Sequence, residues 1–193
     1  MKRAITLGAI GLFVAFFLMY GCNKRNKFVD LNEGVKSQWK QVESQYQRRL
    51  DLIPNIVATV KGQANFEKET LEGIVAARAK ATQITIDPSK LDENSMAKYK
   101  QAQGEISSAL GRLLMVTENY PELKANQAFS DLRVELEGCE NRISVERMKY
   151  NDAVKEFNAS IKKIPGSLFA WGYKDAAYFE AEAGAEKAPK VEF

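Results

Sequence analysis

The chain has 193 residues, of which 45% are hydrophobic and 27% charged, a composition that supports one folded domain of ordinary size. Lys2 and Arg3 are two of its 28 basic residues, so the remainder carries 26 basic against 25 acidic groups, interleaved along the chain. This balance argues against a nucleic-acid partner, which requires a basic stripe. Histidine is absent, which removes the usual general base and the usual metal ligand. We therefore expect no catalytic residue, no metal site and no cofactor.

An uncharged stretch, residues 4–21, follows those two basic residues and ends before Cys22. As a helix its 18 residues span about 27 Å at roughly 1.5 Å per residue, near the thickness of a bilayer core, which favours a retained membrane helix. The alternative is a lipoprotein signal that is cleaved before Cys22, with a lipid on the cysteine sulfur as the anchor. Gly21 fits that alternative, whereas Met19 and Tyr20 fit it poorly.

The charges around this stretch do not fix its orientation, because basic residues flank both of its ends. Since a short cationic start usually precedes export, we expect a bacterial membrane protein with a single N-terminal anchor and an extracytoplasmic body. The expected organisation is an anchor or lipoprotein signal at 1–21, a juxtamembrane linker at 22–27, a helical bundle at 28–179 and a flexible tail at 180–193.

Apolar residues recur every three or four positions from Phe28 to Val60, which predicts one long amphipathic helix that ends near Gly62. Pro54 lies inside it, where it removes a backbone donor and crowds the carbonyl four residues back. We therefore expect a kink near residues 50–53. The groups freed there are expected to be satisfied by polar neighbours, namely Arg48, Arg49, Asp51 and Asn55.

Three further segments carry helical periodicity. Helices are expected at about 66–81 and 93–118, with a loop between them, and over a longer segment at 129–161 that Pro165 ends. Residues 167–179, rich in aromatic side chains, are expected to fold back on these helices. No alternating run of useful length predicts a strand. The predicted fold class is therefore all-α, an antiparallel bundle of three to four long helices with coiled-coil-like seams.

Three groups of residues resemble the sequence motifs of the LemA family, in the family's order and spacing. The first group is RRLDLIPN at 48–55 with TVKG at 59–62. The second is ENYPELKAN at 118–126, followed by Phe129 and Leu132. The third lies in the longest predicted helix and consists of ENRI at 140–143 with Arg147, Tyr150-Asn151 and Phe157-Asn158.

The resemblance to the LemA family implies a small bacterial membrane protein with a helical, mostly extracytoplasmic body. It also implies no established enzymatic activity, and some relatives are associated with magnetosome membranes. Within the motifs, the candidates for partner binding or for a structural role are Arg48, Arg49, Asp51, Pro54, Asn55, Tyr120, Pro121, Asn141, Arg147, Tyr150 and Asn151.

Two interpretations stay open for the first motif. Arg48, Arg49 and Asp51 either pair with one another and with backbone carbonyls at the helix break, which is the commoner role, or form a partner-binding patch. Glu146 and Arg78 fall on the apolar stripes of their helices. We expect both to find polar partners that fix the register of the helices.

The function that we expect is that of a non-enzymatic scaffold or adaptor of the bacterial cell envelope, acting through protein contacts. One alternative is an accessory protein of envelope stress or signalling. Another is a metal-dependent enzyme that uses Glu118, Glu140 and Glu146, which the lack of histidine disfavours. The expected partners are the membrane, through residues 4–21 or a lipid on Cys22, and unidentified envelope proteins. A homo-oligomer stays open.

Overall fold

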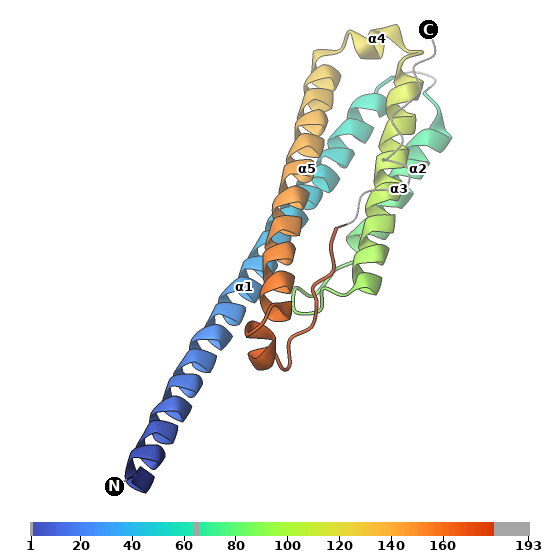
Figure 1. Cartoon of the computed structure of the whole chain (residues 1–193). Coiled ribbons are helices and arrows are strands. Elements are labelled where there is room, and N and C mark those ends of the chain that lie inside the picture. The colour runs from blue at the N-terminus through green and yellow to red at the C-terminus, as the bar shows by residue number, and fades with distance from the viewer. Residues whose placement is uncertain (1, 64–65, 180–193) are drawn as a thin grey trace, which may run out of the picture.

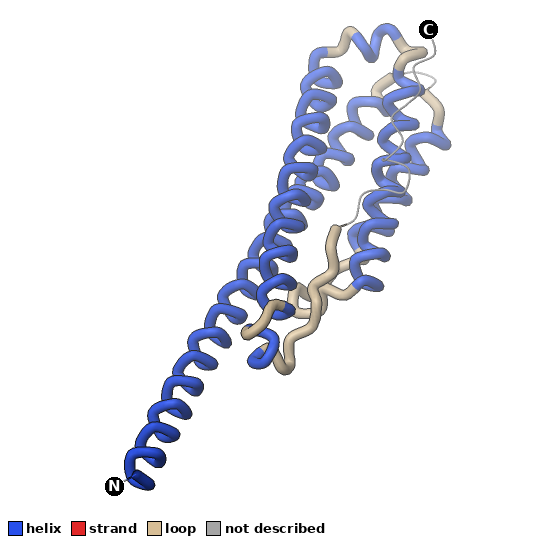
Figure 2. The backbone as a smooth tube through the Cα atoms, viewed as in Figure 1, coloured by secondary structure: helices blue, strands red, loops and turns tan. Residues whose placement is uncertain are grey.

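A computed structural model describes residues 2–63 and 66–179 of the chain, with the backbone alone for residues 2–7, 9 and 13. Helices dominate this part, and no strand occurs within it (Figure 2). The prediction of an all-α fold with long helices is confirmed. In chain order the elements are α1 (Lys2–Lys61), α2 (Lys68–Thr82), α3 (Glu93–Thr117), α4 (Pro121–Lys124), α5 (Gln127–Lys162) and the 3-10 turn η1 (Gly166–Phe169).

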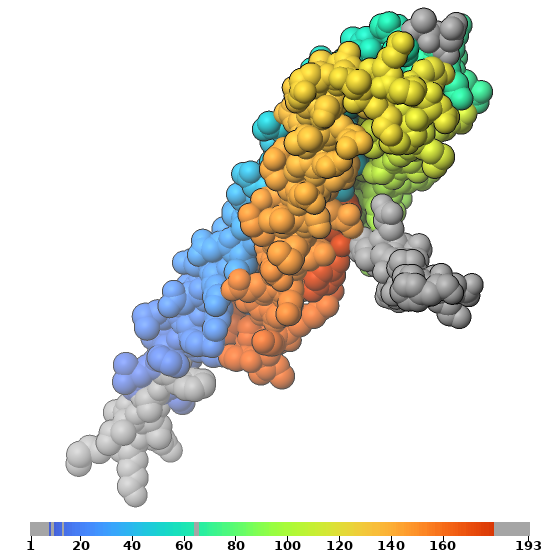
Figure 3. Space-filling view, turned by 90° about the horizontal axis from the view of Figure 1, so that it is seen from above, coloured from blue at the N-terminus to red at the C-terminus, as the bar shows by residue number. Residues whose placement is uncertain are grey.

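The four long helices form an antiparallel bundle (Figure 1). α1 and α3 run in one direction, and α2 and α5 run in the other. α1 packs along α5, and α2 packs along α3. The N-terminal part of α1 extends beyond the bundle, and η1 packs against α1 and α5 close to the place where α1 leaves it. In the space-filling view the outer surface of α5 is exposed along the length of the elongated body (Figure 3).

α1 is one continuous helix through both the predicted linker and Pro54. Residues 22–27, predicted as a linker between anchor and body, are helical. The physical reason is that Lys24, Arg25 and Lys27 are good helix formers and that neither glycine nor proline occurs among these six residues. The body is therefore joined to the N-terminal segment by helix rather than by a flexible connection.

The apolar stripe predicted for α1 faces the bundle. Phe28, Trp39 and Ile53 are completely buried, and the stripe stays buried to Val60. The helix ends at Lys61, immediately before Gly62, as the sequence predicts. This single stripe contributes to the core over nine turns, which explains why α1 can form the spine of the body.

Two of the other helices, α3 and α5, begin at side-chain caps. Asp92 accepts a hydrogen bond from the Ser95 backbone N at 2.8 Å and starts α3. Asn126 accepts one from the Phe129 backbone N at 3.2 Å and starts α5. The sequence predicts a turn followed directly by the longest helix, and the structure inserts the short α4 between them. α4 is separate because the cap at Asn126 begins a new helix.

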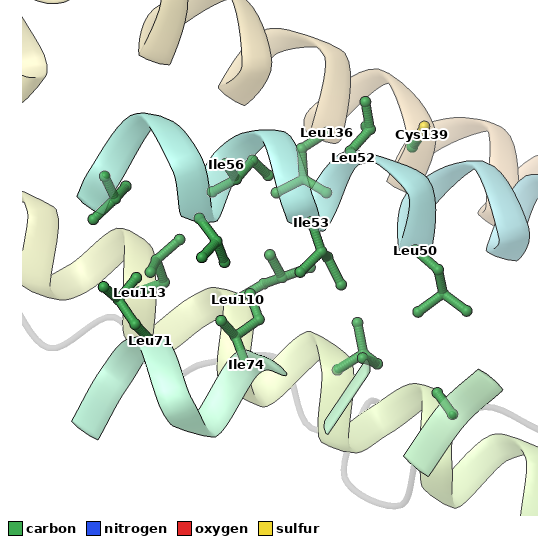
Figure 4. Close-up of a cluster of buried hydrophobic side chains, with 14 of the residues drawn as sticks. Leu50, Leu52, Ile53, Ile56, Leu71, Ile74, Leu110, Leu113, Leu136 and Cys139 are labelled. Atoms are coloured by element: carbon green, nitrogen blue, oxygen red, sulfur yellow. The ribbon is translucent and has the colours of Figure 1, made fainter. Parts of the chain in front are cut away.

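The core consists of two clusters of buried side chains. The distal cluster, at the end away from the N-terminus, joins aliphatic residues of the long helices, among them Leu50, Ile53, Ile74 and Leu113 (Figure 4). The proximal cluster is richer in aromatic side chains. The Trp39 ring centroid lies 5.1 Å from that of Tyr99 and 5.6 Å from that of Tyr150, edge to face in both cases.

Beyond the bundle, α1 exposes large apolar side chains. The exposed fraction reaches 76% at Leu12 and 69% at Met19. Within the residues that the structure describes, no helix combines the length and the apolarity needed to cross a membrane. The predicted anchor at 4–21 falls partly outside this description, since the side chains of 4–7, 9 and 13 are not part of it. The predicted tail at 180–193 lies wholly outside the described residues.

Candidate functional site

Arg49 joins three helices in the middle of the bundle. It is 1% exposed, and from α1 its guanidinium donates hydrogen bonds to Ser107 Oγ at 2.9 Å and to Gln103 Oε1 at 2.8 Å, both on α3. It also donates to Glu140 Oε1 of α5 at 2.7 Å. Because apolar side chains alone leave packed helices free to slide, these directional bonds define the register of the three helices.

The surroundings of this guanidinium suit a structural role. Its Cζ lies 5.1 Å from the centroid of the Tyr46 ring, and the Tyr46 ring lies 5.5 Å from that of Tyr99. Burial raises the pKa of Tyr99 far above its ordinary value, so this phenol stays neutral. An arginine does not release its proton in proteins. Neither Arg49 nor Tyr99 is therefore suited to proton transfer at neutral pH.

The other candidate residues of the first motif lie on the surface. Arg48 makes an exposed ion pair with Glu135 of α5, with Nη2 and Oε1 3.1 Å apart. Asp51 is exposed and accepts a hydrogen bond from Gln47 Nε2 at 2.8 Å. Pro54 and Asn55 are also exposed. The predicted mutual pairing of Arg48, Arg49 and Asp51 is wrong, because each of the three side chains points to a different partner.

The carbonyl released by Pro54 is satisfied from another helix. Arg78 of α2 donates from Nε to the Leu50 backbone oxygen at 3.0 Å. Leu50 lies four residues before Pro54, so its carbonyl is the one that loses a helical donor. The sequence assigns this task to the polar neighbours of Pro54, and the structure corrects it to Arg78. The expectation that Arg78 finds a polar partner is met by this backbone carbonyl.

The second motif closes the distal end of the bundle. The Tyr120 ring packs against Phe66, with centroids 5.0 Å apart. Pro121 occupies the first turn of α4, where its missing N–H costs nothing, and Leu123 of the same turn is buried in the distal cluster. The structure therefore uses this motif to reverse the chain between α3 and α5.

The third motif holds the C-terminal segment 173–179, which we call the strap. Asn151 Nδ2 donates to the Phe179 backbone oxygen at 2.9 Å, and Oδ1 accepts from the Phe179 backbone N at 2.7 Å. Asn158 makes the same pair of bonds with Ala176, both at 2.9 Å. The Tyr150 hydroxyl donates to the Ala177 oxygen at 2.8 Å. The prediction that the residues after α5 fold back on the bundle is confirmed.

Asn158 is missing from the candidates chosen from the sequence. The signal that identifies it is spacing, because Asn151 and Asn158 lie seven residues apart and so face the same side of α5. A side-chain amide offers one donor and one acceptor in the arrangement that an extended backbone presents. Two asparagines separated by two helical turns are therefore a signature of a bound extended segment.

Parts of the first and third motifs meet at one small cavity of about 70 Å³, which Arg49, Glu140 and Arg147 help to line. This volume holds a few waters at most, whereas binding sites for small molecules usually enclose at least about 300 Å³. The Arg147 guanidinium carbon lies 4.2 Å from the centroid of the Phe179 ring. Arg147 therefore adds a further contact to the strap. Asn141, by contrast, is exposed on α5.

The acidic residues considered for a metal site do not converge. Glu118 pairs with Lys124 at 2.6 Å, and Glu140 pairs with Arg49. Glu146 accepts from Lys149 at 2.8 Å and from Gln38 at 2.6 Å, and these bonds lower its pKa. Across the described residues, no three side chains of the metal-binding types gather in one place.

Besides its buried apolar stripe, α5 carries a second stripe on its outer face. Of the residues in this second stripe, only Asn141 is among the candidates chosen from the sequence. The members of this α5 stripe are Val134, Asn141, Val145 and Met148, which follow one another at helical spacing. The exposed fractions of the three apolar members run from 43% at Val145 to 63% at Val134. The signal for it is present in the sequence as apolar residues outside the core stripe of the same helix.

The fold and the motifs together define an all-helical bundle protein whose motif residues mainly join helices and hold the strap. The sequence profile of the LemA family matches residues 38–193, and the chain belongs to the LemA family. The resemblance noted from the sequence is thereby confirmed.

Similarity to individual relatives extends over most of the chain. Magnetosome protein MamQ 2 of Paramagnetospirillum magneticum is 27% identical over 91% of this chain and 70% of its own length. Magnetosome protein MamQ of Magnetospirillum gryphiswaldense is 26% identical over 94% of this chain and 72% of its own length. Protein LemA of Metamycoplasma hominis is 27% identical over 76% and 63%. The two MamQ alignments cover more of the chain than the matched profile and so reach beyond it toward the N-terminus.

Proposed function

We propose that this protein is a non-enzymatic adaptor of the bacterial cell envelope, held at a membrane by its N-terminal segment. The observation that carries the proposal is the division of α1 into two parts. From Phe28 onward its apolar side chains are buried in the bundle, whereas from Ile10 to Met19 large apolar side chains are exposed. Such a contiguous exposed apolar surface is unfavourable in water and favourable in a lipid environment.

The anchor takes one of two chemical forms under this proposal. In the first, the N-terminal part of α1 is retained as a membrane helix. In the second, the chain is cleaved before Cys22, which is exposed, and the lipid on its sulfur provides the attachment. In both forms the body begins at the same place and is expected on the extracytoplasmic side.

Several motif residues are unavailable to partners. Arg49, Tyr150 and Asn151 are engaged inside the body and are not free to bind another protein. The α5 stripe is exposed and combines apolar side chains with the amide of Asn141. Apolar side chains at helical spacing can pack against the apolar face of a partner helix. We therefore assign the partner contact to the α5 stripe.

Membrane attachment is tested by fractionation of cells that produce the full chain. We expect the protein in the membrane pellet after an alkaline wash, and residues 26–193 alone in the supernatant. The variant Cys22→Ser, followed by mass spectrometry, separates the two anchor forms. If wild type is cleaved and acylated and the variant is neither, the anchor is a lipoprotein lipid. If the two masses differ only by the substitution, the anchor is the retained helix. A full chain that stays in the supernatant contradicts the proposal.

Partner contact is tested with a photo-crosslinking amino acid at Met148 on the α5 stripe. Met115 on α3 is the matched control, since it is a methionine of similar exposure, at 73% against 60%, on a different helix. We expect discrete crosslinked products in native membranes from position 148 and none from position 115. Equal products from both positions, or products from position 115 alone, contradict the assignment of the stripe.

A further inference from the structure

The turn that follows α5 exposes an unusual density of large apolar side chains. Ile164, Leu168 and Trp171 are 85%, 65% and 73% exposed and lie within eight residues of one another, around η1. Because these side chains are exposed to water, they bring no stability to the folded chain. Three such side chains in one turn indicate that the turn contacts an apolar surface outside the described chain.

The turn is fastened to α1 where α1 leaves the bundle. The Phe169 ring centroid lies 5.1 Å from that of Phe17 and 6.1 Å from that of Tyr20. Gly21 makes this approach possible, because a Cβ there would lie 2.6 Å from the Phe169 ring. Phe17 precedes Gly21 by four residues, or about 6 Å along the helix. The turn is therefore level with the last turn of the exposed apolar part of α1.

Arg25 holds the tryptophan at this level. Its guanidinium carbon lies 4.3 Å from the centroid of the Trp171 ring, and Nη1 donates to the Trp171 backbone oxygen at 3.5 Å. Tryptophan and tyrosine, flanked by basic side chains, are the residues that concentrate at the boundary between lipid and water. Tyr20, Arg25 and Trp171 form this combination at the base of the body.

Basic side chains collect beside the turn. A pocket of about 640 Å³ between the base of α1 and the end of α5 is lined by Lys24, Lys27, Lys155 and Lys163. Two acidic residues, Asp152 and Glu156, also line it. In the described part of the chain, none of these four lysines forms an ion pair with a carboxylate. The pocket is therefore net positive and suited to phosphate groups.

We propose that the turn at 163–172 docks on the surface of an anionic phospholipid bilayer. Ile164, Leu168 and Trp171 enter the headgroup region, and the lysines of the pocket bind lipid phosphates. The inference rests on the proposed membrane attachment, since the anchor brings the turn to the surface. In the retained-helix form, Phe17, Tyr20 and Gly21 hold the turn against α1. With a lipid on Cys22 these three residues are removed, and the contacts of Arg25 with Trp171 hold the turn beside the lipid.

The test uses the fluorescence of Trp171 in the full chain. The protein is reconstituted in vesicles of phosphatidylglycerol and phosphatidylcholine whose acyl chains carry bromine near the headgroup. Wild type minus Trp171→Phe gives the signal of Trp171, because the second tryptophan, Trp39, is buried in the proximal cluster. As a matched control, Met148→Trp in the Trp171→Phe background places an exposed tryptophan on α5, away from the base.

We expect bromine to quench Trp171 and to leave Trp39 and the tryptophan at position 148 unaffected. Replacement of Lys24, Lys27 and Lys163 by glutamine is expected to weaken docking about fivefold per lysine, which lowers the quenching. If the protein floats with the vesicles and Trp171 is unquenched, the docking inference is wrong and the anchor stands. If the protein does not float with vesicles, both fail. Equal quenching in purely zwitterionic vesicles overturns the role of the lysines.

Discussion

Two adjacent arginines of α1 have opposite environments, and this difference is directly measurable. Arg49 is buried with partners on two other helices, whereas the side chain of Arg48 is 56% exposed in a surface ion pair. Arg49→Ala leaves the buried Gln103 amide without its charged donor. We expect it to lower the free energy of unfolding by about 2–3 kcal/mol, because a buried acceptor left without its donor costs about 1–3 kcal/mol and the other bonds of Arg49 are lost as well.

Arg48→Ala is the control for this prediction. An exposed ion pair contributes roughly 0–1 kcal/mol, so the variant is expected to unfold close to wild type. Urea denaturation of the purified body, followed by far-ultraviolet circular dichroism, measures both. Similar losses for the two variants contradict the structural role that we assign to Arg49.

The bond from Arg78 to the Leu50 carbonyl predicts coupling between Arg78 and Pro54. Arg78→Met removes the donor and is expected to cost about 1–2 kcal/mol of stability. Pro54→Ala restores the helical N–H that the carbonyl otherwise lacks. Arg78→Met is therefore expected to cost less in the Pro54→Ala background, by about 0.5–1 kcal/mol. A double-mutant cycle of denaturation free energies tests this, and strictly additive effects contradict it.

Sequence patterns predict the buried apolar residues better than the polar partners. The stripe from Phe28 to Val60 follows from period alone, since a helix buries one face. The partner of Arg49 does not, because the position of Gln103 relative to it depends on how α1 and α3 pack. The partner of Asp51 is likewise set by tertiary packing, and its expected pairing with Arg48 and Arg49 is not what the structure shows, since it bonds to Gln47.

At the scale of elements, the strap is the part whose attachment depends on a few bonds. Asn151 and Asn158 each exchange two hydrogen bonds with its backbone. Asn151→Ala is expected to increase hydrogen exchange at the Phe179 amide, and Asn158→Ala at the Ala176 amide, by roughly tenfold or more if each change costs about 1.4 kcal/mol or more locally. The helices are expected to keep their protection.

Asn141→Ala serves as the control for the strap. It lies on the same helix and is exposed, so it is expected to leave the exchange of both amides unchanged. Hydrogen exchange read residue by residue by NMR gives the result. A uniform rise over α5 in the two strap variants contradicts a local role, because it shows that the bundle itself is weakened.

Some element boundaries can be predicted from the sequence and others cannot. The C-terminal end of α1 and both ends of α3 are predicted within a few residues, because Gly62, Asp92 and the turn before Pro121 mark them. α4 is not predicted, since a four-residue helix carries no periodic signal. The course of the strap follows only in outline from its aromatic content, because its bonds to α5 are visible only when the backbone of the strap is placed beside the two asparagines.

The stability of the whole molecule is expected to change at both extremes of pH and to stay level between them. Hydrogen bonds from the Ser95 backbone to Asp92, and from Lys80 to Glu105, lower the pKa of each carboxyl group. Such groups add stability above their unfolded pKa of about 4, and this is lost as the pH falls through the lower folded pKa. Burial raises the pKa of Tyr99 and Tyr150, so stability is lost as the pH rises above about 10.

Between these limits no histidine titrates, so we expect the melting temperature to be constant from about pH 6 to 8. Thermal melts at closely spaced pH values measure this profile. Asp92→Asn keeps a capping side chain that does not titrate, and it is expected to remove part of the acid-side loss. A step in the melting temperature near neutral pH contradicts the prediction.

The continuity of α1 also fixes the rotational orientation of the body relative to the exposed apolar part of α1. Its 60 residues span about 90 Å as one rod, from the exposed apolar part to the distal cluster. Each residue of a helix turns by about 100°. The direction in which the α5 stripe faces around the axis of α1 is therefore set by the number of residues between the exposed apolar part of α1 and the bundle. One residue more would turn the stripe by about 100°, whereas seven more would return it to within about 20° and raise it by about 10 Å. A flexible linker would let the body rotate freely, whereas the helical residues 22–27 preserve its orientation.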